Sequence, residues 1–229
     1  MSKKKLVVLT GAGISAESGL KTFRDSDGLW EGYDVSEVAT PGGWRENPQL
    51  VLDFYNQRRK NVAEANPNAA HFGLADLEKD FDVTIITQNI DDLHERAGST
   101  NVLHLHGEIF KMRSERDETI IKEIRGDIRL GDLAEDGNQL RPYIVWFEEP
   151  VTKMEEAVPI VYAAEIFVVV GTSLVVYPAA GLMNYVDQST AKFIVDKKIP
   201  YTTPMKNLTL IEKPATEGVK DLLSLIRQW

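Results

Sequence analysis

Residues Leu6–Leu20 read LVVLTGAGISAESGL, a short apolar run that breaks into a glycine-rich turn. An apolar run of this kind is typical of a buried strand, and glycines directly after it indicate a tight turn into a helix. Glycine lets a backbone approach a ligand closely, and the N–H groups of a helix start attract anions, so a dinucleotide phosphate suits this turn. Ala16 replaces the third glycine of the G-x-G-x-x-G fingerprint, and the turn taken alone is also consistent with a simple tight connection.

The composition is that of an ordinary soluble globular protein. Its 229 residues are 43% hydrophobic and 27% charged, which suits one large domain or a main domain with an insertion. A formal net charge of -9 disfavours nonspecific binding to nucleic acid and to anionic membranes. The basic start Lys3–Lys5 precedes an apolar run that is too short for a signal peptide or a membrane span, so we expect a cytoplasmic protein.

The chain contains no cysteine, which excludes disulfides, thiolate catalysis and cysteine-ligated metal sites. The four histidines are His71, His94, His104 and His106, and none has the H-E-x-x-H spacing of a helical zinc site. We therefore expect no metal site.

Apolar runs and helical patterns alternate along most of the chain. The predicted strands are Leu6–Leu9, Val83–Thr87, Val102–Gly107, Ile166–Val170, Lys192–Val195 and Leu208–Ile211. The predicted helices start at Pro48 with Asn47 as N-cap, cover Ala69–Leu77, end at Arg96, and cover Met154–Ala164, Pro178–Val186 and Thr216–Gln228. Strands that alternate with helices indicate parallel βαβ units, so we predict an α/β fold with a doubly wound parallel sheet.

Two stretches do not follow this alternation. Thr22–Gly43 is rich in glycine and polar residues and predicts an ordered loop. Lys111–Arg141 is densely charged, with a helical pattern only at Glu118–Ile124, and indicates an insertion outside the main sheet. An extended run follows it at Tyr143–Phe147.

Three predicted strands end in clusters of small or polar residues, at Gly11–Gly13, Gln88–Asp91 and Gly171–Ser173. The carboxyl ends of parallel strands lie on one edge of a sheet, where open α/β sheets bind dinucleotides, so we expect the three clusters to converge on a cofactor. His106 also lies at a strand end, directly before a glycine. That position is compatible with a role in ligand chemistry and with a structural role.

These motifs, in this order, resemble those of the sirtuins, which are NAD-dependent protein lysine deacylases. The matching motifs are GAGIS (11–15), ESG (17–19), FR (23–24), GLW (28–30), TQNID (87–91), HG (106–107), VWF (145–147), GTS (171–173) and YPA (177–179). The resemblance spans nearly the whole chain. It implies a Rossmann-type part at about residues 1–30, 78–110 and 142–229, which binds NAD. It also implies a smaller domain formed by two insertions, at about 31–77 and 111–141.

The same resemblance implies the reaction and the residues that serve it. An acyl-lysine protein or peptide enters a cleft between the two parts, its acyl group passes to ADP-ribose, and nicotinamide leaves. His106 is expected to act as general base on a ribose hydroxyl, and Asn89 and Asp91 to hold the ribose and the nicotinamide amide. The NAD-binding residues that the resemblance implies are Gly11, Ala12, Gly13, Ile14, Ser15, Glu17, Phe23, Arg24, Trp30, Gln88, Asn89, Ile90, Asp91, Gly171, Thr172, Ser173, Asp196 and Ala215.

A subgroup of the family resembles the chain at Ala39–Pro41 and Phe54–Arg59, and there a tyrosine and an arginine favour acyl groups that end in a carboxylate. Tyr55 and Arg58 are three residues apart and share one helix face. A guanidinium and a phenol both donate hydrogen bonds to a carboxylate, which suits succinyl- or malonyl-lysine. The expected substrate-binding residues are Tyr55, Arg58, Val145, Trp146 and Phe147. Arg59 and Lys60 are expected to be solvated.

The chain departs from the family pattern in ways that affect stability and substrate contacts. The family's four-cysteine zinc module is missing, so residues 111–141 must hold together without zinc, for which we expect a helix at Glu118–Ile124. Glu148 stands where the family usually has glycine, in the segment that pairs with the substrate. Asp196 replaces an asparagine near the adenosine ribose and keeps the ability to accept hydrogen bonds.

Two other functions are open at this point. One is NAD-dependent ADP-ribosyl transfer to a protein, which uses the same cofactor site with another acceptor. The other is a catalytically silent NAD-binding interaction module, which the missing zinc module favours. The intact His106, Asn89 and Asp91 argue against the silent module, because a protein that only binds NAD has no need for a base.

Overall fold

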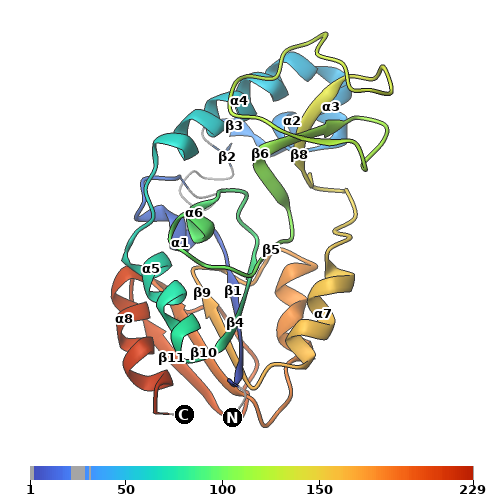
Figure 1. Ribbon diagram of the computed structural model, residues 1–229. Helices are drawn as coiled ribbons and strands as arrows, with labels where there is room; N and C mark the ends of the chain where they lie inside the picture. Colours follow the sequence, from blue (N-terminus) through green and yellow to red (C-terminus); the bar gives the residue numbers. More distant parts are fainter. Residues whose placement is uncertain (1–2, 22–28, 31, 229) are drawn as a thin grey trace.

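The computed structural model describes residues 3–21, 29–30 and 32–228, and six strands of these segments form a parallel central sheet (Figure 1). Their order is β11-β10-β9-β1-β4-β5. The strands are β1 (Lys5–Thr10), β4 (Asp82–Thr87), β5 (Val102–His104), β9 (Ile166–Val170), β10 (Ala191–Asp196) and β11 (Leu208–Glu212). Because β1 pairs with β4 on one side and with β9 on the other, the chain changes direction at β1. Such a switch point creates a crevice at the carboxyl ends of the strands.

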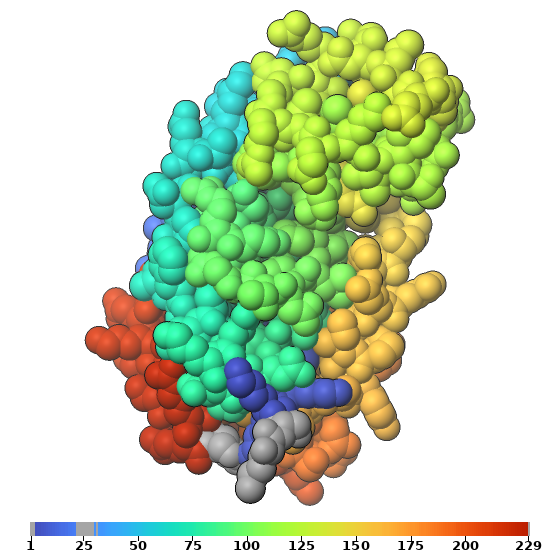
Figure 2. All heavy atoms as spheres, in the orientation of Figure 1, coloured from blue at the N-terminus to red at the C-terminus, as the bar shows by residue number. Residues whose placement is uncertain are grey.

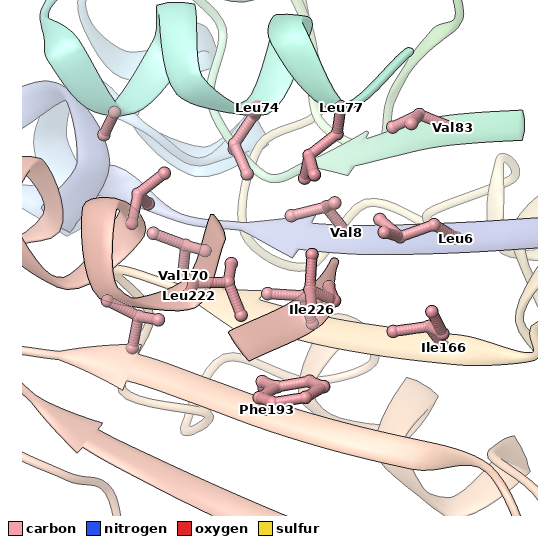
Figure 3. Packing of buried hydrophobic residues seen from close by; sticks show 14 of the residues in the cluster. Leu6, Val8, Leu74, Leu77, Val83, Ile166, Val170, Phe193, Leu222 and Ile226 are labelled. Atoms are coloured by element: carbon pink, nitrogen blue, oxygen red, sulfur yellow. The ribbon is translucent and has the colours of Figure 1, made fainter. Parts of the chain in front are cut away.

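Helices cover both faces of this sheet. They are α5 (Ala69–Asp76), η1 (Leu77–Lys79) and α8 (Ala215–Ile226) on one face, and α7 (Met154–Tyr162) and η2 (Ala179–Tyr185) on the other. In Figure 3, Leu74 and Leu77 point toward β1 near Val8, and Leu222 lies beside Val170. The alternate residues Val7 and Leu9 pack on the opposite face. Since successive side chains of a strand point to opposite faces, the run Leu6–Leu9 of β1 is apolar because the strand is buried on both sides.

A second sheet lies beyond the carboxyl ends of the central strands (Figure 1). It is antiparallel, with the order β7-β6-β8, and its strands are β6 (Gly107–Ser114), β7 (Ile121–Glu123) and β8 (Leu140–Ile144). The elements that accompany it are β2 (Leu29–Trp30), β3 (Tyr33–Asp34), α2 (Val35–Val38), α3 (Pro41–Glu46) and α4 (Pro48–Glu64). They share a core of their own, which includes Trp44, Tyr55, Ile109, Ile128 and Trp146. In Figure 2 the yellow-green residues around β7 and β8 form the end of the molecule opposite the start of β1.

These features confirm the predicted fold class, a doubly wound parallel sheet with a smaller part formed by two insertions. The exact residue boundaries of the two parts stay a prediction. Asn47 caps α4 as predicted, because its side chain accepts a hydrogen bond from the backbone N–H of Leu50. Two further short helices, α1 (Ala12–Ala16) and α6 (Leu93–Arg96), follow the carboxyl ends of β1 and β4. No helix of the described segments is long and apolar enough to cross a membrane.

Two local predictions are wrong. The described portion of Thr22–Gly43 contains β2, β3, α2 and the start of α3 instead of a plain loop. Side-chain caps define these short helices, since Asp34 accepts from Ser36 N–H and Thr40 accepts from Gly43 N–H. Glu118–Ile124 is not a helix. It contains strand β7, which pairs with β6, so a tertiary partner overrides the helical pattern.

Smaller differences concern element ends and burial. The strand predicted at Val102–Gly107 ends at His104, and Gly107 begins β6. The helix predicted after Pro178 is a 3-10 helix. The helical pattern of α5 predicts that Phe72 can join the core. In the structure Phe72 is 52% exposed, and Leu74 is buried instead.

Arg59 anchors the second sheet to α4, which corrects the prediction that this side chain is solvated. It is 1% exposed, and its guanidinium donates hydrogen bonds to Ile109 O at 2.8 Å, Gly126 O at 3.2 Å and Asn56 Oδ1 at 2.8 Å. Burial lowers the pKa of Arg59 to about 10, so it stays charged at neutral pH. Lys60 is exposed, as predicted, and pairs with Asp127. These hydrogen bonds connect α4 with β6 and with the segment before Ile128.

Candidate active site

A cleft of about 1110 Å³ opens at the carboxyl ends of β1, β4 and β9. Residues of the central sheet line one wall, among them Gly11, Asn89 and Thr172. The opposite wall comes from the smaller part and from the chain that leaves β8, including Tyr55 and Trp146. The cleft therefore lies where the sheet topology places a ligand site and where the two parts meet.

Close packing of two glycine loops forms the floor of the cleft. Gly13 N–H donates to Gly171 O at 2.8 Å, and a β-carbon added to Gly13 would lie only 2.7 Å from that oxygen. The loops also connect to the third cluster, because Gln88 Nε2 donates to Thr172 Oγ1 at 3.0 Å. All three clusters therefore converge, as the parallel topology predicts. Bare backbone and small side chains line the floor, which allows a phosphate-bearing ligand to approach closely.

Behind this floor lies a buried polar network around Asn89. Its side-chain amide donates to Ser15 Oγ at 3.1 Å and to Gly11 O at 3.2 Å, which leaves the amide oxygen for a ligand. Ser15 Oγ in turn donates to Asp91 Oδ2 at 3.0 Å. Burial raises the pKa of Asp91, while hydrogen bonds from Leu93 N–H and Ser15 oppose the rise. Asp91 thus holds Ser15 and, through it, Asn89, and it does not line the cleft itself.

Two neighbouring histidines have different environments. His106 lines the cleft, and its Nδ1 lies 3.0 Å from Gln88 O. Burial lowers the pKa of His106, which keeps the imidazole neutral at pH 7, although the hydrogen bond to Gln88 O partly opposes this shift. His104 has acceptors at both ring nitrogens, Asn89 O at 3.0 Å and Glu95 Oε1 at 2.7 Å. Burial alone would lower the pKa of His104, but the hydrogen bond and the charge of Glu95 outweigh it, so the pKa of His104 is raised whereas that of His106 is lowered.

Tyr55 and Arg58 lie on one face of α4. Tyr55 lines the cleft but is fully shielded from solvent, and its hydroxyl has no hydrogen-bond partner among the described residues. Burial raises the pKa of Tyr55, and the nearby charge of Arg58 opposes that rise. The guanidinium carbon of Arg58 lies 4.4 Å from the centre of the Trp30 ring. A buried hydroxyl beside a buried cation is suited to an anionic ligand group.

The segment Val145–Phe147 crosses from one part to the other along the cleft. Val145 N–H donates to His106 O at 2.9 Å, and Phe147 N–H donates to Ala39 O at 2.9 Å. Trp146 N–H donates to Glu149 Oε2 at 2.8 Å, and Arg141 binds both carboxylate oxygens of Glu149. Hydrogen bonds therefore fix this segment at several points, next to the candidate base.

The Sir2 family model matches residues 11–178 of the chain. The chain belongs to the Sir2 family. A protein of Helicobacter pylori named "NAD-dependent protein deacylase" is 53% identical over 220 residues, which are 96% of this chain and 96% of that protein. Among solved structures, a Sir2 homologue in complex with NAD is 39% identical with a TM-score of 0.87 and covers 99% of this chain and 90% of its own. A Sir2 protein bound to an acetylated peptide is 30% identical with a TM-score of 0.81. The match covers 98% of this chain and 94% of that protein's chain.

The structure of this Sir2-family chain places most of the predicted site residues on the cleft. The predicted NAD-binding residues that line it are Gly11, Ala12, Gly13, Glu17, Trp30, Gln88, Asn89, Ile90, Gly171, Thr172, Ser173, Asp196 and Ala215. Tyr55, His106, Val145, Trp146 and Phe147 line it as well. Ser15, Ile14 and Asp91 are buried behind the wall, and Arg58 is buried against Trp30. Phe23 and Arg24 lie outside the described residues.

Sequence reasoning missed two ionisable residues near this Sir2 site. His104 contacts Glu95 at 2.7 Å, and this contact depends on α6 and is not visible in the strand pattern. Glu149 is held by Arg141, which lies eight residues earlier in β8. Its position two residues after the VWF motif was the available indication. Within the described segments, no three His, Asp or Glu side chains are grouped to hold a metal ion.

Proposed function

We propose that this Sir2-family chain is an NAD-dependent protein lysine deacylase. It removes an acyl group from lysine, transfers it to ADP-ribose and releases nicotinamide. The observation that carries the proposal is His106, a neutral imidazole that lines the same cleft as the two glycine loops. The name of the Helicobacter pylori relative, the homologue in complex with NAD and the Sir2 protein bound to an acetylated peptide support the same activity.

The donor set on the cleft floor fits NAD. Gly11, Gly13 and Gly171 present backbone without side chains, while Thr172, Ser173 and Gln88 offer polar groups for ribose and phosphate. The Asp196 carboxylate, at the end of β10, accepts hydrogen bonds from ribose hydroxyls of the adenosine half. When bound, NAD supplies the ribose carbon that receives the acyl-lysine oxygen and the nicotinamide that departs.

His106 acts as the general base. A carbonyl oxygen only accepts hydrogen bonds, so the contact with Gln88 O places the imidazole proton on Nδ1 and leaves Nε2 unprotonated. Nε2 takes the proton of a ribose hydroxyl, and the lowered pKa keeps this nitrogen available at neutral pH. Asn89 orients the ribose and nicotinamide through its amide oxygen, and Asp91 keeps the Asn89 amide in place through Ser15.

The preferred acyl groups end in a carboxylate, as in succinyl- and malonyl-lysine. This preference rests on the buried hydroxyl of Tyr55, which has no hydrogen-bond partner among the described residues, and on the buried charge of Arg58 beside it. Leaving a buried donor without an acceptor costs about 1–3 kcal/mol, and a carboxylate in the inner cleft would satisfy it. Acetyl-lysine lacks that group and is expected to be the poorer substrate.

An acyl-peptide panel tests this function. Purified protein is incubated with NAD and one peptide that carries acetyl-, succinyl- or malonyl-lysine, and the peptide mass and the released nicotinamide are measured. We expect equal amounts of deacylated peptide and nicotinamide, with the acidic acyl groups fastest. Absence of turnover with every acyl peptide would refute the deacylase. Label from NAD that appears on protein instead would favour ADP-ribosyl transfer.

A further inference from the structure

Glu148 has a backbone conformation that side chains rarely adopt. Its φ is +72°, in the left-handed region, which glycine adopts without strain and a residue with a β-carbon adopts only with strain. The neighbours on both sides impose this turn. Phe147 N–H is bound to Ala39 O, and Glu149 is held by Arg141 through its side chain and by Trp146 O through its backbone. The chain therefore keeps a glutamate at a position that glycine would occupy without strain.

The Glu148 side chain is exposed on the wall of the cleft. Nothing in the described part of the chain forms a hydrogen bond or an ion pair with its carboxylate. The adjacent Glu149 differs, because Arg141 and Arg113 neutralise its charge. Glu148 therefore brings an uncompensated negative charge to the cleft, directly after the segment that would pair with a peptide.

Strained residues that persist in a fold cluster at functional sites, because the surrounding structure holds them there for the group that they present. The strain at Glu148 is not offset by a polar interaction, since its carboxylate forms no hydrogen bond or ion pair within the described fold. What it offers is a charge at the peptide wall, beside the exposed ring of Phe147. A peptide with a lysine or arginine next to its acyl-lysine would bring a cation to this carboxylate, and an acidic neighbour would be repelled.

We propose that Glu148 is a specificity-determining residue, which selects peptides that carry a basic residue beside the acyl-lysine. This inference rests on the proposed deacylase function and concerns the peptide, whereas Tyr55 and Arg58 concern the acyl group. Exposed ion pairs contribute modestly, so we expect a preference of about two- to fivefold in kcat/KM for a basic over an acidic neighbour. The preference should lie in KM, because Glu148 is not among the reacting groups, and it should decline as salt is added.

The test uses three otherwise identical acyl-lysine peptides, with a lysine, a glutamine or an aspartate beside the acyl-lysine. Wild type is compared with Glu148→Gln, which removes the charge and keeps the shape, and with Glu148→Lys, which reverses the charge. Glu155→Gln is the matched control, because Glu155 is exposed in the first turn of α7, does not line the cleft, and its substitution changes net charge equally. Binding of the three peptides is also measured by fluorescence anisotropy, without NAD and therefore without turnover.

We expect the basic preference to vanish in Glu148→Gln, to invert in Glu148→Lys and to persist in Glu155→Gln. A ratio that is the same in wild type and Glu148→Gln would overturn the proposal, and so would an equal loss in the Glu155→Gln control. If wild type turns over none of the peptides, the deacylase function is refuted. The ratio of the affinities for the basic and the acidic peptide, measured by anisotropy, then still tests the role of Glu148.

A stability measurement supplies an independent readout. Glu148→Gly should not lower the Tm and should raise it by about 2–4 °C, because glycine adopts the left-handed conformation without strain. The same variant should lose the basic preference. A lower Tm in Glu148→Gly would contradict the inference that Glu148 destabilises the fold and is retained for its function.

Discussion

The Nδ1 atom of His106 lies 3.0 Å from the backbone oxygen of Gln88. Gln88 is the first residue after β4, and its own side chain reaches Thr172 on the second glycine loop. The strand end that contacts the second glycine loop therefore also fixes the tautomer of the candidate base. Because a backbone atom makes the contact, this orientation does not depend on a second side chain.

Replacing this base should separate chemistry from cofactor binding. In His106→Ala, we expect the rate of deacylation to fall by about 10²- to 10⁴-fold, which is the usual contribution of a general base. NAD binding should survive, because the glycine loops and Asn89 are untouched. Nicotinamide release measures the first effect and calorimetric titration with NAD the second. Full turnover in His106→Ala would show that another group takes the proton.

The pH dependence of the reaction should report the burial of His106. A general base must be unprotonated, and burial lowers the pKa of His106 below its ordinary value of 6.5. Activity should therefore be retained at pH 6.5 and fall only at more acidic pH, as Nε2 gains a proton. The measurement is kcat/KM against pH with one acyl peptide. An acid limb with its midpoint above 6.5 would contradict this assignment.

The preference for acidic acyl groups should depend on the charge of Arg58 more than on the shape of the acyl group. For Arg58→Met, we expect desuccinylation to fall by about 10- to 100-fold, since a charge-assisted hydrogen bond to a carboxylate contributes about 1.5–3 kcal/mol. Deacetylation should change much less. Tyr55→Phe removes only the hydroxyl and should show a smaller effect of the same kind. Because Arg58 is buried, the Tm of each variant is recorded, and equal losses for both acyl groups would refute the carboxylate role.

The central sheet and the converging loops were predictable because local patterns determine them. Buried strands such as β9 are unbroken runs of apolar residues, and Gly171 follows β9 at the place where the loops touch. Parallel topology then fixes which strand ends meet. By contrast, β7 has a weak pattern of its own and exists because β6 pairs with it. Such an element depends on residues far along the chain, which local periodicity does not register.

Helix α4 shows the same limit of sequence-based prediction for individual residues. Tyr55 and Arg58 share one face of this helix and were grouped correctly as neighbours, because residues three apart lie side by side. Asn56 and Arg59 share the adjacent face, where Asn56 exchanges two hydrogen bonds with the backbone of Ile128. The sequence shows both pairs as polar residues of one charged helix. Only the packing of the second sheet distinguishes a solvated arginine from a buried one.

The buried guanidinium of Arg59 should be a main source of stability for the part that contains the second sheet. In Arg59→Met, the carbonyl oxygen of Ile109 and the amide oxygen of Asn56 lose their donor in a buried environment. We expect a loss of about 2–4 kcal/mol in the free energy of unfolding, or a Tm lower by roughly 5–15 °C. Lys60→Met is the control, because the neighbouring lysine is exposed, and it should change stability by less than about 1 kcal/mol. Thermal unfolding of both variants, with and without a chelator, measures these effects. A Tm for Arg59→Met equal to that of wild type would show that the apolar core around Ile128 holds α4 and the second sheet together without the guanidinium.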